Sequence, residues 1–223
     1  MTRIVAVAGV APAVGTSTLA VGLHDWMTER GLSVDLVEED EVLTRPVFAP
    51  MARELAVTGI CTVATLTSSI EAFVNEVAES AYDVVICDAL FPFVRSLHDW
   101  DSGEIAIDGF LADCTRALAA VPFTLVYVDA DIYAALRHAD VREPSGWLEW
   151  YLANMIRDEP SADLDPVDVA VDLLARERDE ALRLMTQHGW DVRRVPESDL
   201  LTPAEILDLA KRQLSGTHPV SQK

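Results

Sequence analysis

Short apolar runs alternate along the chain with longer segments in which apolar residues recur every three or four positions. The first pattern is typical of strands that are buried on both faces, and the second is typical of the helices that cover them. Five segments are predicted as strands, and they comprise residues 4–8, 33–37, 83–87, 123–128 and 190–195. The alternation therefore predicts an α/β fold of three layers, with a five-stranded parallel sheet and helices on both of its faces.

Capping residues mark where several helices begin. Asp165 and Thr202 are each followed by a proline, which is favoured at the first position of a helix, and Glu205 completes a capping box with Thr202. Between the first two strands, apolar residues recur at helical spacing until Gly31 ends the pattern. Residues 215–223 lack an apolar pattern, so we predict a single domain over residues 1–214 and a flexible tail after it.

Charge and length limit the classes of partner. The 223 residues suit one domain, and 37 acidic against 17 basic residues give a net charge of −20. Such a surface repels nucleic acid and anionic membranes, so neither is an expected partner. No apolar run is long enough to span a bilayer, and the chain starts with a strand-like segment rather than a signal peptide. We therefore predict a cytoplasmic protein, and a homodimer is compatible with the sequence.

Residues outside the motifs described below are interpreted as structural. The three cysteines are widely spaced in apolar surroundings, which fits free core thiols in a reducing compartment. Trp147, Trp150 and Tyr151 recur at helical spacing, and such aromatics more often belong to a core than stack on an acceptor or an adenine. The histidines are scattered without an H-x-x-x-H pair, so histidine metal ligation is not predicted.

The segment after the first predicted strand carries the main functional signal. Residues 9–18 read GVAPAVGTST and lead directly into a helix. Small residues at a helix N-terminus present backbone N–H groups and the positive end of the helix dipole to an anion. The segment resembles the P-loop (Walker A motif, G-x-x-x-x-G-K-[ST]) of nucleotide-binding kinases. A tight turn that only caps the helix is the alternative interpretation.

The resemblance implies that this loop binds the phosphates of a nucleotide. Gly15 takes the place of the second glycine, and Ser17 that of the hydroxyl that ligates magnesium. Two positions depart from the motif, because Val10 stands in the register of the first glycine and Thr16 replaces the lysine. The residues implied in phosphate binding are Gly9, Ala13, Val14, Gly15, Thr16, Ser17 and Thr18.

The missing lysine requires another source of positive charge. Removing one preorganised donor of this kind costs about 10²–10³ in rate. The only lysines are Lys211 and Lys223, near the C-terminus, so arginine must compensate. The segment after the fourth strand resembles the arginine-bearing helical lid of such kinases, at about residues 132–162, and it places Arg137 and Arg142 over the donor phosphates. Ordinary surface ion pairs are the alternative role for both arginines.

Acidic and basic residues after the second and third strands complete the predicted site. Asp88 ends an apolar strand and looks like a Walker B aspartate, which holds magnesium or accepts a proton; a turn-forming aspartate is the alternative. Asp40 and Glu39 follow the second strand, where related kinases contact the acceptor hydroxyl or the metal; a solvated acidic loop is the alternative. Arg45 and Arg95 are predicted to bind the substrate, with packing as the alternative for Arg95.

Together these motifs imply an ATP- and Mg²⁺-dependent phosphotransferase acting on a small hydroxylated metabolite. Ser17 and Asp88 hold the metal, Asp40 or Asp88 accepts the hydroxyl proton, and the two lid arginines, Arg137 and Arg142, stabilise the transferred phosphoryl group.

Two other functions remain open. A kinase-like protein can bind a nucleotide or a metabolite without turnover. A sulfotransferase-like enzyme is also compatible, since Gly15-Thr16-Ser17 resembles the loop that grips a phosphosulfate donor. Such loops usually carry a basic residue and a serine before the glycine, whereas this chain has Ala13-Val14.

Overall fold

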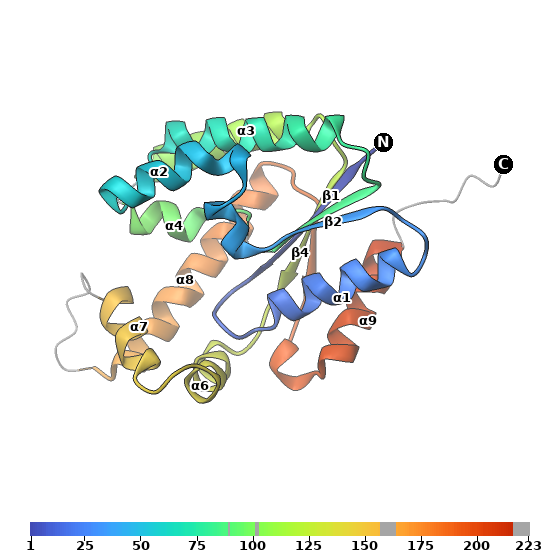
Figure 1. The fold of residues 1–223 in the computed structure, drawn as a ribbon. Helices are drawn as coiled ribbons and strands as arrows, with labels where there is room; N and C mark the ends of the chain where they lie inside the picture. The colour runs from blue at the N-terminus through green and yellow to red at the C-terminus, as the bar shows by residue number, and fades with distance from the viewer. Residues whose placement is uncertain (89, 101–102, 157–163, 216–223) are drawn as a thin grey trace.

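The computed structural model describes residues 1–88, 90–100, 103–156 and 164–215 (Figure 1). Within these residues, five strands form one sheet whose strands are all parallel. The strands lie within one or two residues of their predicted positions, and they are β1 (Arg3–Gly9), β2 (Val34–Val37), β3 (Val84–Asp88), β4 (Phe123–Val128) and β5 (Val192–Val195). The predicted strand pattern is therefore confirmed.

The order of the strands across the sheet is β2-β3-β1-β4-β5. Val7 of β1 is in register with Asp88 of β3, and Gly9 is in register with Val128 of β4. Since parallel strands end at the same edge of a sheet, the loop after β1 lies between the residues that follow β3 and β4. The chain moves to one side of β1 to form β2 and β3 and to the other side to form β4 and β5, and ligands bind at such a divergence in open parallel sheets.

Helices cover both faces of the sheet and confirm the three-layer α/β architecture. One face carries α1 (Thr16–Thr28) and α9 (Pro203–Ser215), which pack against each other (Figure 1). The opposite face carries α3 (Val63–Glu79), α5 (Glu104–Leu118) and α8 (Pro166–Gln187).

Shorter elements connect these layers. They are the helices α2 (Ala49–Thr58), α4 (Val94–Asp99), α6 (Ile132–Arg142) and α7 (Trp147–Met155), and the 3₁₀ turns η1 (Glu39–Leu43), η2 (Pro46–Phe48) and η3 (Ser198–Leu200). The helices α6 and α7 follow β4, where the lid is predicted, and Figure 1 shows them beyond the ends of the strands. Residues 157–162 of the predicted lid and residues 216–223 of the predicted tail lie outside the described part of the chain.

The predicted helix caps are present in the structure. The side chain of Asp165 accepts a hydrogen bond from the backbone N–H of Val167 at 2.8 Å. Thr202 and Glu205 form the reciprocal capping box, with N–H···O distances of 3.3 and 2.9 Å. Because these bonds satisfy N–H groups that have no partner within the helix, the local sequence alone fixes where α8 and α9 begin.

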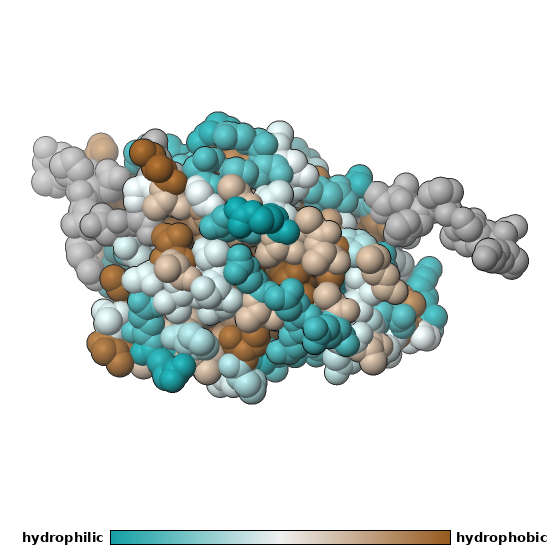
Figure 2. All heavy atoms as spheres, turned by 90° about the horizontal axis from the view of Figure 1, so that it is seen from above, coloured by the Kyte–Doolittle hydropathy of each residue, from teal (hydrophilic) through white to brown (hydrophobic). Residues whose placement is uncertain are grey.

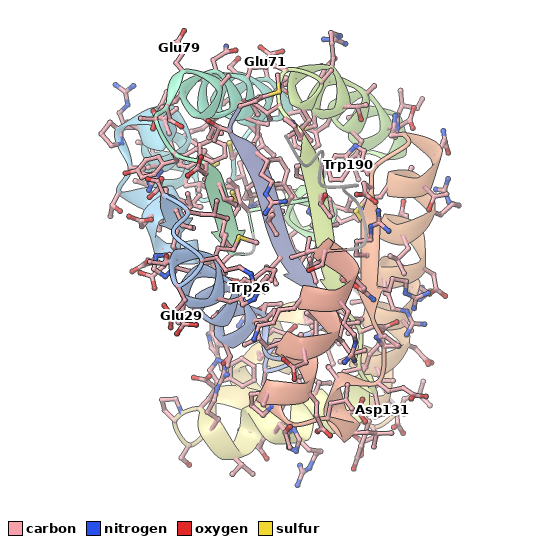
Figure 3. The ribbon with its side chains drawn as sticks, turned by 90° about the vertical axis from the view of Figure 1, so that its right-hand side faces the viewer. Trp26, Glu29, Glu71, Glu79, Asp131 and Trp190 are labelled. Atoms are coloured by element: carbon pink, nitrogen blue, oxygen red, sulfur yellow. The ribbon has the colours of Figure 1, made fainter. Side chains whose placement is uncertain are left out.

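The core lies between the sheet and its helices. Nearly all side chains of β1, β3 and β4 are buried, and the three cysteines are free and buried, as the sequence predicts. Trp190 fixes β5 to the helical layer, because its indole N–H donates to Thr115 on α5 at 2.7 Å and its ring packs against Phe91 and Phe123 (Figure 3). This contact joins segments that are 75 residues apart.

The surface is mixed in hydropathy. On the face in Figure 2, hydrophobic residues are scattered among hydrophilic ones. Trp26 of α1 is partly shielded by two cations, Arg30 at 4.5 Å and Lys211 of α9 at 6.0 Å from its ring centroid (Figure 3). None of the helices formed by the described residues has the length and apolar character required to span a bilayer.

Candidate functional site

A cavity of about 470 Å³ opens at the edge of the sheet where the strands end. Its walls are the loop between β1 and α1, residues 91–96 after β3, and one face of α8. Glu39, Arg142 and Tyr151 contribute from η1, α6 and α7. The cavity therefore lies at the position where a parallel sheet of this topology binds its ligands.

The loop after β1 forms the floor of this cavity. Ala13 and Gly15 adopt left-handed backbone angles, with φ of 62° and 98°, and the chain then enters α1 at Thr16. The N-cap residue is Gly15, which has no side chain to cap this helix end, so within the described part of the chain the first N–H groups of α1 can bind an anion. Every loop residue predicted to bind phosphate lines the cavity except Val14.

The side chain of Val14 packs against the core instead of lining the cavity. Val14 is buried, and its carbonyl accepts a hydrogen bond from the Ser198 hydroxyl at 3.4 Å. Its side chain also explains why position 9 is glycine, since a Cβ on Gly9 would lie 2.4 Å from Cγ2 of Val14 and 2.9 Å from Cγ2 of Thr16. The loop is thus closed on its inner side and open on the side that faces the cavity.

Asp88, Ser17 and Glu39 form a polar cluster beside the loop. Asp88 is 4% exposed, and among the described residues its Oδ1 has no hydrogen-bond partner. Burial raises the pKa of Asp88, and a hydrogen bond with Ser17 lowers it by less. Glu39 is an exposed residue, but its pKa is also raised, mainly by partial desolvation and further by the charges of Asp88 and Asp40. Because desolvation disfavours the charged form of both carboxylates, a bound cation would stabilise them.

The donor set of this cluster suits Mg²⁺ better than a metal held by protein ligands alone. Hydroxyl and carboxylate oxygens are its preferred ligands, and Mg²⁺ usually keeps several waters and takes the remaining positions from substrate phosphates. In the part of the chain that the structure describes, no three His, Cys, Asp or Glu side chains form a metal-binding group. Ser17 and Asp88 would therefore supply part of the coordination of Mg²⁺.

Among the described residues, three arginines line the cavity, and only some of them are arginines that the sequence suggests. Arg142 lines it from the end of α6, with its side chain 63% exposed and paired with Glu143 at 2.6 Å. Arg137 points elsewhere: it pairs with Asp140 on its own helix at 3.3 Å and does not line the cavity. Arg178 of α8, which sequence reasoning missed, lines the cavity with its side chain 26% exposed.

Arg178 is placed by a buried carboxylate at the end of β4. Asp129 is 8% exposed and forms an ion pair with Arg194 of β5, and Arg178 approaches the same carboxylate at 3.7 Å. The second partner of Arg178 is Asp179, at 2.9 Å, whose side chain is 70% exposed. The guanidinium is therefore held beside the β1 loop by one buried contact and one weak surface contact.

Arg95 is the third cavity arginine, and it lies where the sequence predicts. It is bound to Glu177 of α8 at 2.5 Å and to Asp99 at 3.5 Å. Glu177 lines the cavity, and burial raises its pKa more than Arg95 lowers it. Tyr151 lies close to this pair and stacks on Trp147 with a centroid distance of 4.8 Å. One aromatic of α7 thus faces the cavity, whereas Trp150 is 63% exposed.

Arg45 and Asp40, like Val14, Asp88 and Arg137, are not among the residues that line the cavity. Arg45 donates two hydrogen bonds of 2.9 Å to Asp35, which ties the segment after η1 to β2. Asp40 is exposed on η1, one position after Glu39, and its side chain does not reach the cavity lining. A signal for the residues that were missed is visible in α8, because Glu177 and Arg178 interrupt an otherwise apolar stripe at helical spacing.

Comparisons with known proteins do not indicate a function for this chain. No family model matches the chain, and no curated protein matches it. Among solved structures, one described as "Crystal structure of APE1195" is similar to this chain at 18% identity and a TM-score of 0.42, covering 80% of this chain and 96% of that one. A likeness at this level carries no functional conclusion, so function is inferred below from the site.

Proposed function

We propose that this protein is a phosphotransferase that uses ATP and Mg²⁺ to phosphorylate a small hydroxylated molecule. The observation that carries the proposal is the buried Oδ1 of Asp88, which has no partner among the described residues and lies beside Ser17 at the open N-terminus of α1. A buried carboxylate without a partner is costly unless a cation binds it. Free N–H groups next to it favour a phosphate.

On this proposal, each residue of the site has a separate role. The N–H groups at the start of α1 would hold the terminal phosphates. Ser17 and Asp88 would hold Mg²⁺, which when bound would supply Lewis-acid polarisation of the phosphoryl group. Glu39 is better placed than Asp40 to accept the proton of the acceptor hydroxyl, because it lines the cavity and its raised pKa lies closer to neutral pH.

Arg178 and Arg142 supply the charge that Thr16 does not. Both line the cavity, and each has a surface partner, Asp179 or Glu143, of the kind that contributes little to stability. A guanidinium engages two phosphate oxygens at once, so the exchange of partners favours the nucleotide. Arg137 takes no part in this proposal, since it pairs on the surface of α6.

The test is a titration of the purified chain with ATP in the presence and absence of Mg²⁺, followed by detection of ADP with a panel of hydroxylated acceptors. Magnesium-dependent binding and acceptor-dependent ADP release support the proposal. Magnesium-dependent binding without ADP release favours a kinase-like binding protein. Thermal stabilisation by a phosphosulfate donor and none by ATP would favour the sulfotransferase alternative and contradict the proposal.

A further inference from the structure

The residues that line the cavity fall into two groups of different chemistry. The first group comprises the β1 loop, with its backbone N–H groups, and the cations Arg142 and Arg178. The second group comprises the lining residues after β3, Tyr151 of α7 and the other lining residues of α8, with Phe93, Tyr151 and Leu174 as its apolar part. We call the first group the nucleotide half of the lining and the second the acceptor half, or acceptor wall. On the proposed function, it is where the molecule to be phosphorylated binds.

Charges are unevenly distributed over the acceptor wall. Glu177, Asp99 and Glu180 bring three carboxylates, and the cations that pair with them are Arg95 and His98. Even with a protonated imidazole, the carboxylates outnumber the cations. Glu177 is the one that lines the cavity, with its side chain 15% exposed. The net charge of this cluster is therefore negative. Glu177, the carboxylate with the lowest exposure of the three, is the one that faces the ligand.

The nucleotide half adds to this imbalance. A magnesium-bound triphosphate carries about two negative charges, which two guanidinium groups balance. With Arg142 and Arg178 engaged in this way, the charged side chains that remain in the cavity lining, among the residues that the structure describes, are Arg95, Glu177 and Glu39. They sum to one negative charge, and the buried Asp88 lies close by. A further anion in the acceptor half would be repelled, and a cation would be attracted.

From this balance we propose that the acceptor is an amino alcohol: a hydroxylated molecule whose protonated amine binds Glu177 and whose apolar body lies against Tyr151 and Leu174. The proposal rests on the proposed function for its hydroxyl and on the acceptor wall for its amine. An ammonium group shares the Glu177 carboxylate with Arg95, as a carboxylate has lone pairs for more than one donor. The aromatic face of Tyr151, stacked on Trp147, gives the adjacent carbon frame a rigid surface.

Three probes of the same size test the charge preference. They are 2-amino-1-phenylethanol, 1-phenylethane-1,2-diol and mandelate, which share a benzylic hydroxyl and differ in charge from positive through neutral to negative. Their dissociation constants are measured by ligand-observed NMR, with and without Mg²⁺ and a nonhydrolysable ATP analogue. We expect the amine to bind most tightly and mandelate at least about tenfold more weakly, as one partly buried charge pair implies.

Variants assign the preference to one carboxylate. Glu177→Gln is expected to weaken binding of the amine about tenfold and to leave the diol within twofold, whereas Glu177→Asp keeps the order of the three probes. Glu149→Gln, which removes an exposed carboxylate of α7 outside the cavity lining, serves as the matched control. Thermal unfolding checks that each variant is folded. If Glu177→Gln does not fold, the order of the probes on the unaltered protein decides.

The outcomes separate the two proposals. Mandelate binding as tightly as the amine, no detectable binding of the amine, or a preference that survives in Glu177→Gln overturns the amino-alcohol proposal. Failure of the ATP analogue to bind, at any probe result, counts against the proposed function instead. An amine preference that depends on Glu177 without nucleotide still assigns the chemistry of this wall.

Discussion

The substitution Arg178→Ala gives the most direct test of charge compensation in the cavity. The side chain lies beside the β1 loop, and its buried partner Asp129 keeps its ion pair with Arg194 when Arg178 is removed. The fold should therefore survive. A hydrogen bond to a charged group contributes about 1.5–3 kcal/mol, so loss of one guanidinium is expected to weaken ATP binding about 10- to 100-fold.

The assay is a titration with Mg²⁺–ATP at two salt concentrations, because a lost phosphate contact also reduces the salt dependence of binding. Binding of the nucleoside without phosphates should not change. Arg183→Ala is the matched control: it lies on the same helix, is exposed, and bonds only to Gln187 among the described residues, at 3.3 Å. A dissociation constant for ATP within twofold of the unaltered protein, for both Arg178→Ala and Arg142→Ala, would refute the reasoning.

Three further predictions follow from the loop and the carboxylates. Burial raises the folded-state pKa of Asp88, so the native state keeps that proton to higher pH and stability falls as pH rises above the unfolded value of about 4. Asp88→Asn should remove this fall, as thermal melts over a range of pH will show, and should abolish Mg²⁺-dependent ATP binding. Gly9→Ala should lower the free energy of unfolding by about 1–3 kcal/mol, since the new Cβ would lie 2.4 Å from a methyl group of Val14. The control Gly109→Ala, in α5 with open space around it, should raise the free energy of unfolding by about 0.5–1 kcal/mol. Denaturant titration measures the change for each variant. Glu39→Gln should slow turnover by about 10²–10⁴, and Asp40→Asn should leave it within twofold, as steady-state kinetics will show; equal effects would contradict the assignment of the base.

The sequence by itself determined the elements of the fold. The apolar runs at β1, β3 and β4 predicted central strands correctly. A central strand is covered on both faces, so successive residues must be apolar, and this pattern can be read from the sequence. The caps at Asp165 and Thr202 fixed helix starts because their hydrogen bonds span three residues or fewer. The β1 loop was predictable for the same reason, since strand, loop and helix are continuous in the chain.

Only the tertiary structure decided which charged side chains meet. The local sequence does not tell whether Arg45 or Arg178 reaches the cavity. In the structure Arg45 is bound by Asp35 of the nearby strand β2, whereas Arg178 lines the cavity from α8, which is distant from the β1 loop in the sequence. The partners of an arginine in an acidic protein depend on which carboxylate the strand order brings nearest, and this order is set by packing of the whole sheet. Local patterns report burial along one element, and they carry no information on contacts between elements, such as the pair Arg95 and Glu177, 82 residues apart.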